Sequence, residues 1–250
     1  MEILQSVFRW VHVVAGIIWI GHLYFFNFVN GPFAGTLDGE TKKKVIPQLM
    51  PRALFWFRWG AAYTWVTGLL LLLLVFYHGG IVLEDPALGW SGAAFLVVGL
   101  TFLAPFIYEG VIKSPLAKNP KLLAGSALVL IASLLFLMQW AGFGYRGATI
   151  HIGTAFGTIM AFNVWFRIWP WQRKIVTAVK EGQAPDAALV AQAGLRSRQN
   201  TYLSVPLVWT MINAHTTWAS SSPWIFLGLV AVSWIGFQHL YKKAGKVPGF

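Results

Sequence analysis

The residues best suited to chemistry in this sequence are its six histidines, because imidazole binds metal ions and moves protons near neutral pH. The stretch HVVAGIIWIGH places His12 and His22 ten residues apart, with only apolar, glycine and tryptophan residues between them. In a helix, this spacing separates the two rings by about 15 Å along the axis and about 80° around it. Both rings can therefore point into one helix bundle at different depths.

The composition indicates an integral membrane protein embedded in a lipid bilayer. Of the 250 residues, 57% are hydrophobic and 11% are charged, which is unusual for a soluble domain. A transmembrane helix needs about 20 mostly apolar residues. We expect an all-α fold, with residues 1–250 forming a single polytopic membrane domain and residues 30–53 and 170–202 forming the larger polar loops. The seven expected transmembrane helices cover about residues 4–29, 54–78, 91–113, 122–143, 149–169, 203–219 and 224–241.

The basic residues predict the orientation of these helices. They gather in alternate connections: Lys42, Lys43, Lys44 and Arg52; Lys113, Lys118 and Lys121; Arg173, Lys174, Lys180, Arg196 and Arg198; Lys242, Lys243 and Lys246. By the positive-inside rule, the N-terminus is outside and the C-terminus inside. This topology accounts for the net charge of +11, and nothing in the sequence resembles a groove-reading module, so we expect no nucleic-acid partner.

With this orientation, each histidine has a depth in the membrane. The outer group is His12, His78, His151 and His215, and the inner group is His22 and His239. Ionisable residues inside a bilayer usually face the bundle interior and mark functional sites. Imidazoles from different helices can hold haem b, and the two groups leave room for one haem or two. Arg9, one turn above His12, could pair with a haem propionate.

The other interpretations of these histidines remain open. A buried imidazole can simply hydrogen-bond to a neighbouring carbonyl or hydroxyl, and His78 and His239 stand near helix ends where solvation suffices. The chain has no cysteine, which excludes thiolate-bound clusters and c-type haem attachment within these residues. Zinc or copper could use the same imidazoles for metal-ion transport or sensing, although carboxylates are nearly absent from the spans, which favours haem.

Several other polar residues in or near the apolar segments could assist such a site. Arg58, Glu109 and Arg167 occupy the predicted inner ends of three spans, where they could form a salt-bridged cluster or hold inner propionates. Asn163 and Asn213 could orient a substrate or a histidine ring, although hydrogen bonding between helices is the more ordinary role.

Motifs along nearly the whole chain resemble one known family. They are WVHVVAGIIWIG, FRWGAAYTWVTG, IYEGVIKSPL, HIGTAFGTIMAFNVWFRIWPWQRK and SRQNTYLSVPLVWTMINAH, in this order. The sequence is similar to the membrane domain of the bacterial membrane-bound urate hydroxylases, the urate oxidase N-terminal family, which usually carry a C-terminal cytochrome c. The resemblance implies a location in the bacterial cytoplasmic membrane and oxidation of urate to 5-hydroxyisourate, with electrons passed to a cytochrome c.

The resemblance also assigns site residues, and the sequence departs from the family pattern in places. His12, His151, His215 and His239 fall on family-like histidines, whereas His22 stands where the family pattern suggests a small residue. The chain shows no haem-attachment motif, so we expect a separate cytochrome c or another redox protein as the electron acceptor. The alternative is a two-haem transmembrane electron carrier without urate activity, in which His22 would serve a second haem.

Overall fold

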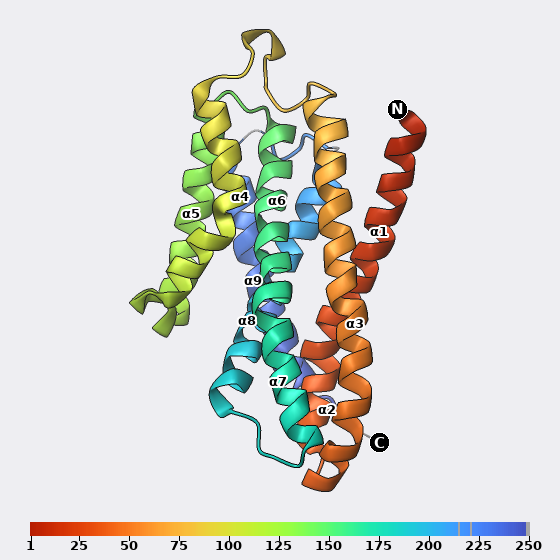
Figure 1. Ribbon diagram of the computed structural model, residues 1–250. Helices are drawn as coiled ribbons and strands as arrows, with labels where there is room; N and C mark the ends of the chain where they lie inside the picture. The colour runs from red at the N-terminus through yellow and green to blue at the C-terminus, as the bar shows by residue number, and fades with distance from the viewer. Residues whose placement is uncertain (215, 221, 249–250) are drawn as a thin grey trace. The chain divides into compact units, whose positions relative to one another are not determined.

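The computed structural model describes residues 1–214, 216–220 and 222–248, and in this part of the chain every long element is a helix (Figure 1). The predicted all-α fold is therefore confirmed for these residues. The helices are α1 (Glu2–Tyr24), α2 (Gly31–Thr36), α3 (Gly39–Leu71), α4 (Gly92–Lys113), α5 (Pro120–Trp140), α6 (Tyr145–Asn163), α7 (Trp169–Lys180), α8 (Ala187–Asn213) and α9 (Pro223–Ala244).

Three π-helical turns extend or join these helices. They are Phe25–Asn30 between α1 and α2, Leu72–Tyr77 after α3, and Val164–Ile168 between α6 and α7. Two short 3₁₀ helices, Pro86–Leu88 and Pro115–Lys118, lie in the connections on either side of α4. A π-helical turn carries an extra residue per turn, so the side chains that follow it are rotated relative to the preceding face.

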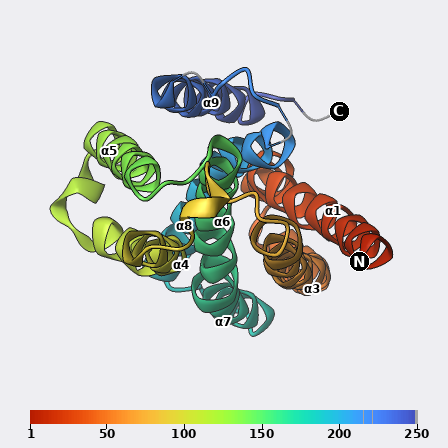
Figure 2. The ribbon, with the colours of Figure 1, turned by 90° about the horizontal axis from the view of Figure 1, so that it is seen from above.

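The chain forms two compact units. The first unit consists of Met1–Gln5, Gly68–Ile159 and Ser204–Trp234, and the second consists of Ser6–Thr67, Met160–Leu203 and the segment from Ile235 onward. Within the first unit α4 packs beside α5, and within the second α1 lies beside α3 (Figure 2). Each unit is described below by itself.

Each predicted span overlaps a helix of the described residues, and five segments are long and apolar enough to cross a membrane. These are Glu2–Thr36, Gly39–Tyr77, Gly92–Lys113, Pro120–Trp140 and Pro223–Ala244. α6 and α8 are not among the five, because both carry many polar residues; most of α6 is buried inside the protein. The total of seven spans and their orientation stay predictions.

The two segments predicted as polar loops are largely helical instead. Residues 39–53 form the first turns of α3, which accommodates Pro47 and Pro51, and residues 169–180 and 187–202 belong to α7 and α8. Residues 187–202 of the second predicted loop are continuous with the predicted sixth span in α8. Hydropathy finds where a helix enters lipid, but it does not find where the helix ends, because helices continue into water when their ends are capped.

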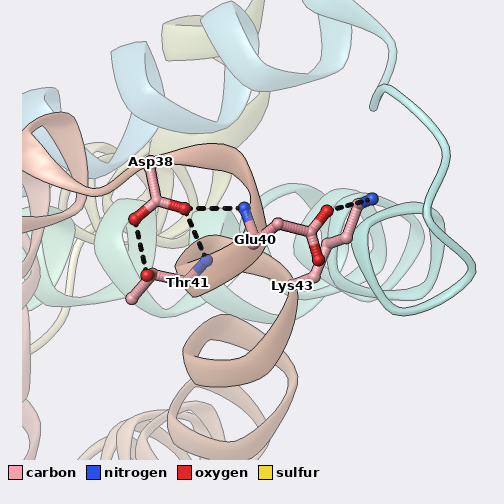
Figure 3. Close-up of polar contacts among 4 residues, drawn as sticks. All are labelled: Asp38, Glu40, Thr41 and Lys43. Atoms are coloured by element: carbon pink, nitrogen blue, oxygen red, sulfur yellow. Dashed lines mark hydrogen bonds and ion pairs between the residues drawn. The ribbon is translucent and has the colours of Figure 1, made fainter.

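Asp38 caps the N-terminus of α3 (Figure 3). Its Oδ1 accepts hydrogen bonds from the backbone N–H groups of Glu40 at 2.9 Å and Thr41 at 3.0 Å, and its Oδ2 accepts from the Thr41 hydroxyl at 2.6 Å. The hydroxyl bond and the backbone bonds lower the pKa of the Asp38 carboxyl, because all of them stabilise its charged form. The cap explains why helix α3 begins well before its apolar residues.

Gly60 allows α3 to approach α1 at backbone distance. A Cβ placed on Gly60 would lie 3.0 Å from the Trp19 nitrogen and 3.2 Å from the Ala15 carbonyl oxygen. Both are backbone atoms of α1 and cannot rotate away. Small residues permit this kind of close helix packing in membranes, where van der Waals contact drives association.

We therefore predict that Gly60→Ala destabilises the protein by about 1–3 kcal/mol, because the added methyl group forces α1 and α3 apart. The matched control is Gly99→Ala in α4, where an added Cβ meets nothing within 4 Å. Replacing glycine by alanine in an unobstructed helix should be neutral or stabilising by up to about 1 kcal/mol. Thermal unfolding of the detergent-solubilised protein, followed by circular dichroism, measures both. Equal midpoints for the two variants would contradict the close contact.

Candidate functional site

Three of the histidines share one hydrogen-bonding arrangement. The Nδ1 atoms of His12, His22 and His151 lie 2.9, 2.7 and 2.7 Å from the backbone oxygens of Thr64, Ile18 and Gly147, respectively. A carbonyl oxygen can only accept, so each Nδ1 carries the proton and each Nε2 keeps its lone pair. Metal-binding histidines commonly show this arrangement, in which a carbonyl fixes the ring and leaves Nε2 to coordinate.

His12 lies in the second unit, where α3 holds its ring. Nδ1 donates to the Thr64 carbonyl and also lies 3.2 Å from Oγ1 of Thr67, which itself donates to the carbonyl of Tyr63 at 2.6 Å. The His12 side chain is partly buried. Because a neighbouring helix supplies the acceptor, the packing of α1 on α3 sets the orientation of the ring and hence the direction of Nε2.

Trp19 lies two helical turns after His12 on the same face of α1. Its side chain is 1% exposed, and among the described residues its indole Nε1 has no hydrogen-bond partner. Leaving a buried N–H unpaired costs about 1–3 kcal/mol. A buried donor of this kind calls for an acceptor, and a water molecule or a bound ligand could supply one.

His151 lies in the first unit and is fully buried. Its Nε2 is 2.7 Å from the hydroxyl oxygen of Tyr77. Since Nδ1 already donates to Gly147, Nε2 must accept, and the Tyr77 hydroxyl must donate. Both ring nitrogens of His151 are therefore hydrogen-bonded, and ligation of a metal by Nε2 would require the Tyr77 hydroxyl to leave.

Aromatic rings enclose the Tyr77–His151 pair. The ring of Trp90 stacks on Tyr77, with centroids 5.2 Å apart and planes inclined by 8°, and Phe143 meets His151 edge-on at 5.0 Å. Two backbone hydrogen bonds hold the α3–α4 connection near this pair: Glu84 N–H donates to Gly142, and Gly144 N–H donates to Val82. The pair is thus covered by a connection that is itself tied to the start of α6.

The other predicted site residues are placed differently. The His22 ring is partly buried and lies 6.4 Å from the ring of Phe26, whereas His78, His239 and Arg9 are exposed. His215 lies outside the described residues. Among the residues that the structure describes, no group of three or more His, Asp or Glu side chains is placed to hold a metal ion. The assignment of these residues to a site stays a prediction.

Arg58 is held by aromatic rings rather than by a carboxylate. Its guanidinium carbon lies 4.0 Å from the ring centroid of Trp169, and the Trp165 indole donates to its backbone carbonyl at 3.1 Å. Glu109 forms an ion pair with Lys113 on its own helix at 3.4 Å. Cation–π contact stabilises the guanidinium, whereas the buried Arg58 Nε has no hydrogen-bond partner among the described residues.

Two buried amides join α6 to α8 in the second unit. Asn163 donates to the side-chain oxygen of Asn200 at 2.8 Å, and Asn200 donates to the Met160 carbonyl at 3.0 Å. Both side chains are fully buried. Asn213, the other amide noted in the sequence, accepts from the Trp218 indole at 3.0 Å near the end of α8. Asn163 therefore has the ordinary role of a buried amide, which is to hydrogen-bond one helix to another.

Sequence inspection missed Tyr77, which gives His151 its second hydrogen bond. The titratable residue of this turn that the sequence singles out is its neighbour His78, which is exposed. Tyr77 ends a π-helical turn, which rotates it out of the phase that a regular helix would predict. The available signal was an aromatic residue with a polar tip inside an apolar span, where its hydroxyl needs a partner.

A model of the urate oxidase N-terminal family matches residues 33–247. The chain belongs to the urate oxidase N-terminal family. The resemblance noted in the sequence is thereby confirmed. The family match includes His151, His215 and His239, whereas His12 and His22 precede it. No curated protein and no solved structure matched the chain.

For this urate oxidase N-terminal chain, we predict that Tyr77→Phe lowers the free energy of unfolding by about 1–3 kcal/mol, because the buried Nε2 of His151 loses its donor. Tyr63→Phe is the matched control: it lies in α3, which continues into the turn that carries Tyr77, and 57% of its surface is exposed, so no buried partner loses a donor. Thermal unfolding compares the two variants. A Tyr77→Phe midpoint equal to that of Tyr63→Phe would show that the bond to His151 contributes nothing.

Proposed function

We propose that the protein is a membrane haem-b oxidoreductase that oxidises urate to 5-hydroxyisourate. Water supplies the added oxygen, and the reaction releases two protons and two electrons. The electrons pass one at a time to a cytochrome c, whose covalent haem cannot be attached within these 250 residues because they contain no cysteine. Membership of the urate oxidase N-terminal family over residues 33–247 is the observation that carries this proposal.

The donor chemistry around His12 fits a haem ligand. The Thr64 carbonyl accepts a hydrogen bond from the Nδ1–H group, so the ring is the neutral imidazole whose Nε2 lone pair would bind the iron. A haem bound there supplies an iron that gains and loses single electrons, which matches a one-electron acceptor such as cytochrome c. The unpaired indole N–H of Trp19 on the same helix face would gain an acceptor from a bound propionate or substrate.

Other residues near the histidines would fix the position of protons and supply positive charge. Thr64 and Thr67 keep the His12 ring in one tautomer and one orientation. Arg9, exposed one turn before His12, would offer its guanidinium to a propionate in bidentate fashion. In the structure His151 fits a different role: Tyr77 donates to its Nε2, so this pair holds a proton between two titratable groups.

A second candidate is a two-haem transmembrane electron carrier without urate activity. The observation that favours it is His22, whose Nδ1 donates to Ile18 so that Nε2 also retains its lone pair. His12 and His22 would then serve two sites about 15 Å apart along α1. Transport or sensing of a metal ion has less support, because no group of three or more acidic or histidine ligands occurs among the described residues.

The first test is the visible spectrum of the purified protein and of His12→Ala. The wild-type protein should show a Soret band, and the variant should lose at least half of its haem because the axial nitrogen is gone. His78→Ala, which removes an exposed imidazole, is the matched control and should keep its full haem content. Size-exclusion chromatography confirms that each variant is folded. Full haem in His12→Ala would exclude this ligand.

The second test separates the two candidate functions by activity and by redox titration. A urate oxidase should reduce added cytochrome c when urate is present, with loss of urate and formation of 5-hydroxyisourate in a ratio of one to one. The two-haem carrier should instead show two redox transitions, of which His22→Ala removes one. Loss of urate without reduction of cytochrome c would contradict the proposed acceptor.

A further inference from the structure

A basic cleft of about 580 Å³ lies in the second unit between α3 and α7. Four cationic side chains line it: Lys43, Lys44, Arg173 and Lys180. At the sequence level these residues serve only as markers of the cytoplasmic side. The structure brings them to one concavity, because residues 44, 47, 48, 51 and 54 share one face of α3, and residues 169, 173, 176, 177 and 180 share one face of α7.

The positive charge of the cleft is largely uncompensated. No acidic residue lines it, and the one ion pair recorded at its rim among the described residues joins Lys43 to Glu40 at 2.9 Å. The side chains of Lys44, Arg173 and Lys180 are exposed. Several like charges around one cavity repel one another, and an anion with phosphate geometry relieves that repulsion through charge-assisted hydrogen bonds.

The other half of the cleft is apolar. Pro51 and Leu54 of α3 and Trp169 of α7 contribute apolar surface beside the cations. Leu54 begins one predicted span and Trp169 ends another, so this part of the cleft lies at the expected level of the membrane interface, where tryptophan is enriched. A free inorganic anion would use the cations and leave the apolar surface unfilled.

We propose that this cleft binds the headgroup of an anionic phospholipid from the cytoplasmic leaflet. The phosphodiester would contact Lys44 and Arg173, and the glycerol with the first acyl carbons would cover Pro51 and Trp169. Basic pockets between transmembrane helices on the cytoplasmic side are suited to such headgroups. The proposal is independent of haem and of urate, because no residue of the cleft belongs to the histidine sites described above.

The test is native mass spectrometry of the full-length detergent-solubilised protein with added phosphatidylglycerol or phosphatidylcholine. The wild-type protein should bind phosphatidylglycerol in preference. Lys44→Gln combined with Arg173→Gln should weaken phosphatidylglycerol binding by about tenfold or more, since each interfacial cation contributes substantially to anionic lipid binding. Lys118→Gln combined with Lys121→Gln removes one cation from the α4–α5 connection and one from the first turn of α5, both outside the cleft, and should leave binding unchanged.

Further measurements decide the remaining outcomes. The single variant Arg173→Lys keeps both positive charges and should retain most of the phosphatidylglycerol binding. Unchanged helical circular dichroism shows that the variants are folded. If the double glutamine variant fails to fold, the two single variants replace it. Equal binding of the two lipids, an unaffected double variant, or competition by glycerol 3-phosphate as strong as that by the lipid would each overturn the proposal.

Discussion

Polar groups in an apolar helix bundle have little water to bond to, so most of them pair within the protein, and this requirement shapes the sites described above. The backbone satisfies itself by forming helices, so the polar side chains have to use carbonyls, hydroxyls or one another. His12 uses Thr64, His151 uses Gly147 and Tyr77, and Asn163 uses Asn200. Because the group that accepts from Nδ1 is a backbone carbonyl in each case, the imidazoles of His12, His22 and His151 are left in the same tautomer.

This common tautomer links packing to chemistry. The His12 ring is oriented by a carbonyl on α3, and α3 reaches α1 only because Gly60 has no side chain. A change in helix packing at Gly60 would therefore alter the direction of the Nε2 lone pair without touching the histidine. In His151 the acceptor is one turn back on its own helix, so that ring depends less on its neighbours and more on Tyr77.

The sequence predicted the helical class and the approximate segments, because apolar runs follow from the membrane itself. The family resemblance was also correct. Other features depended on tertiary structure. The π-helical turn Leu72–Tyr77 changes the phase at Tyr77, and the continuation of α3 and α7 beyond their apolar residues turns loop lysines into a cleft. Neither periodicity nor hydropathy reports where two polar helix ends meet.

The connection between α3 and α4 has a consequence for the buried imidazole of the first unit. Trp90 stacks on Tyr77, Glu84 bonds to Gly142, and a Cβ on Gly147 would collide with the backbone of Val82. On the side of the α3–α4 connection, these contacts shield the His151 ring from solvent. Isotope exchange at the His151 ring through this side therefore requires the α3–α4 connection to open.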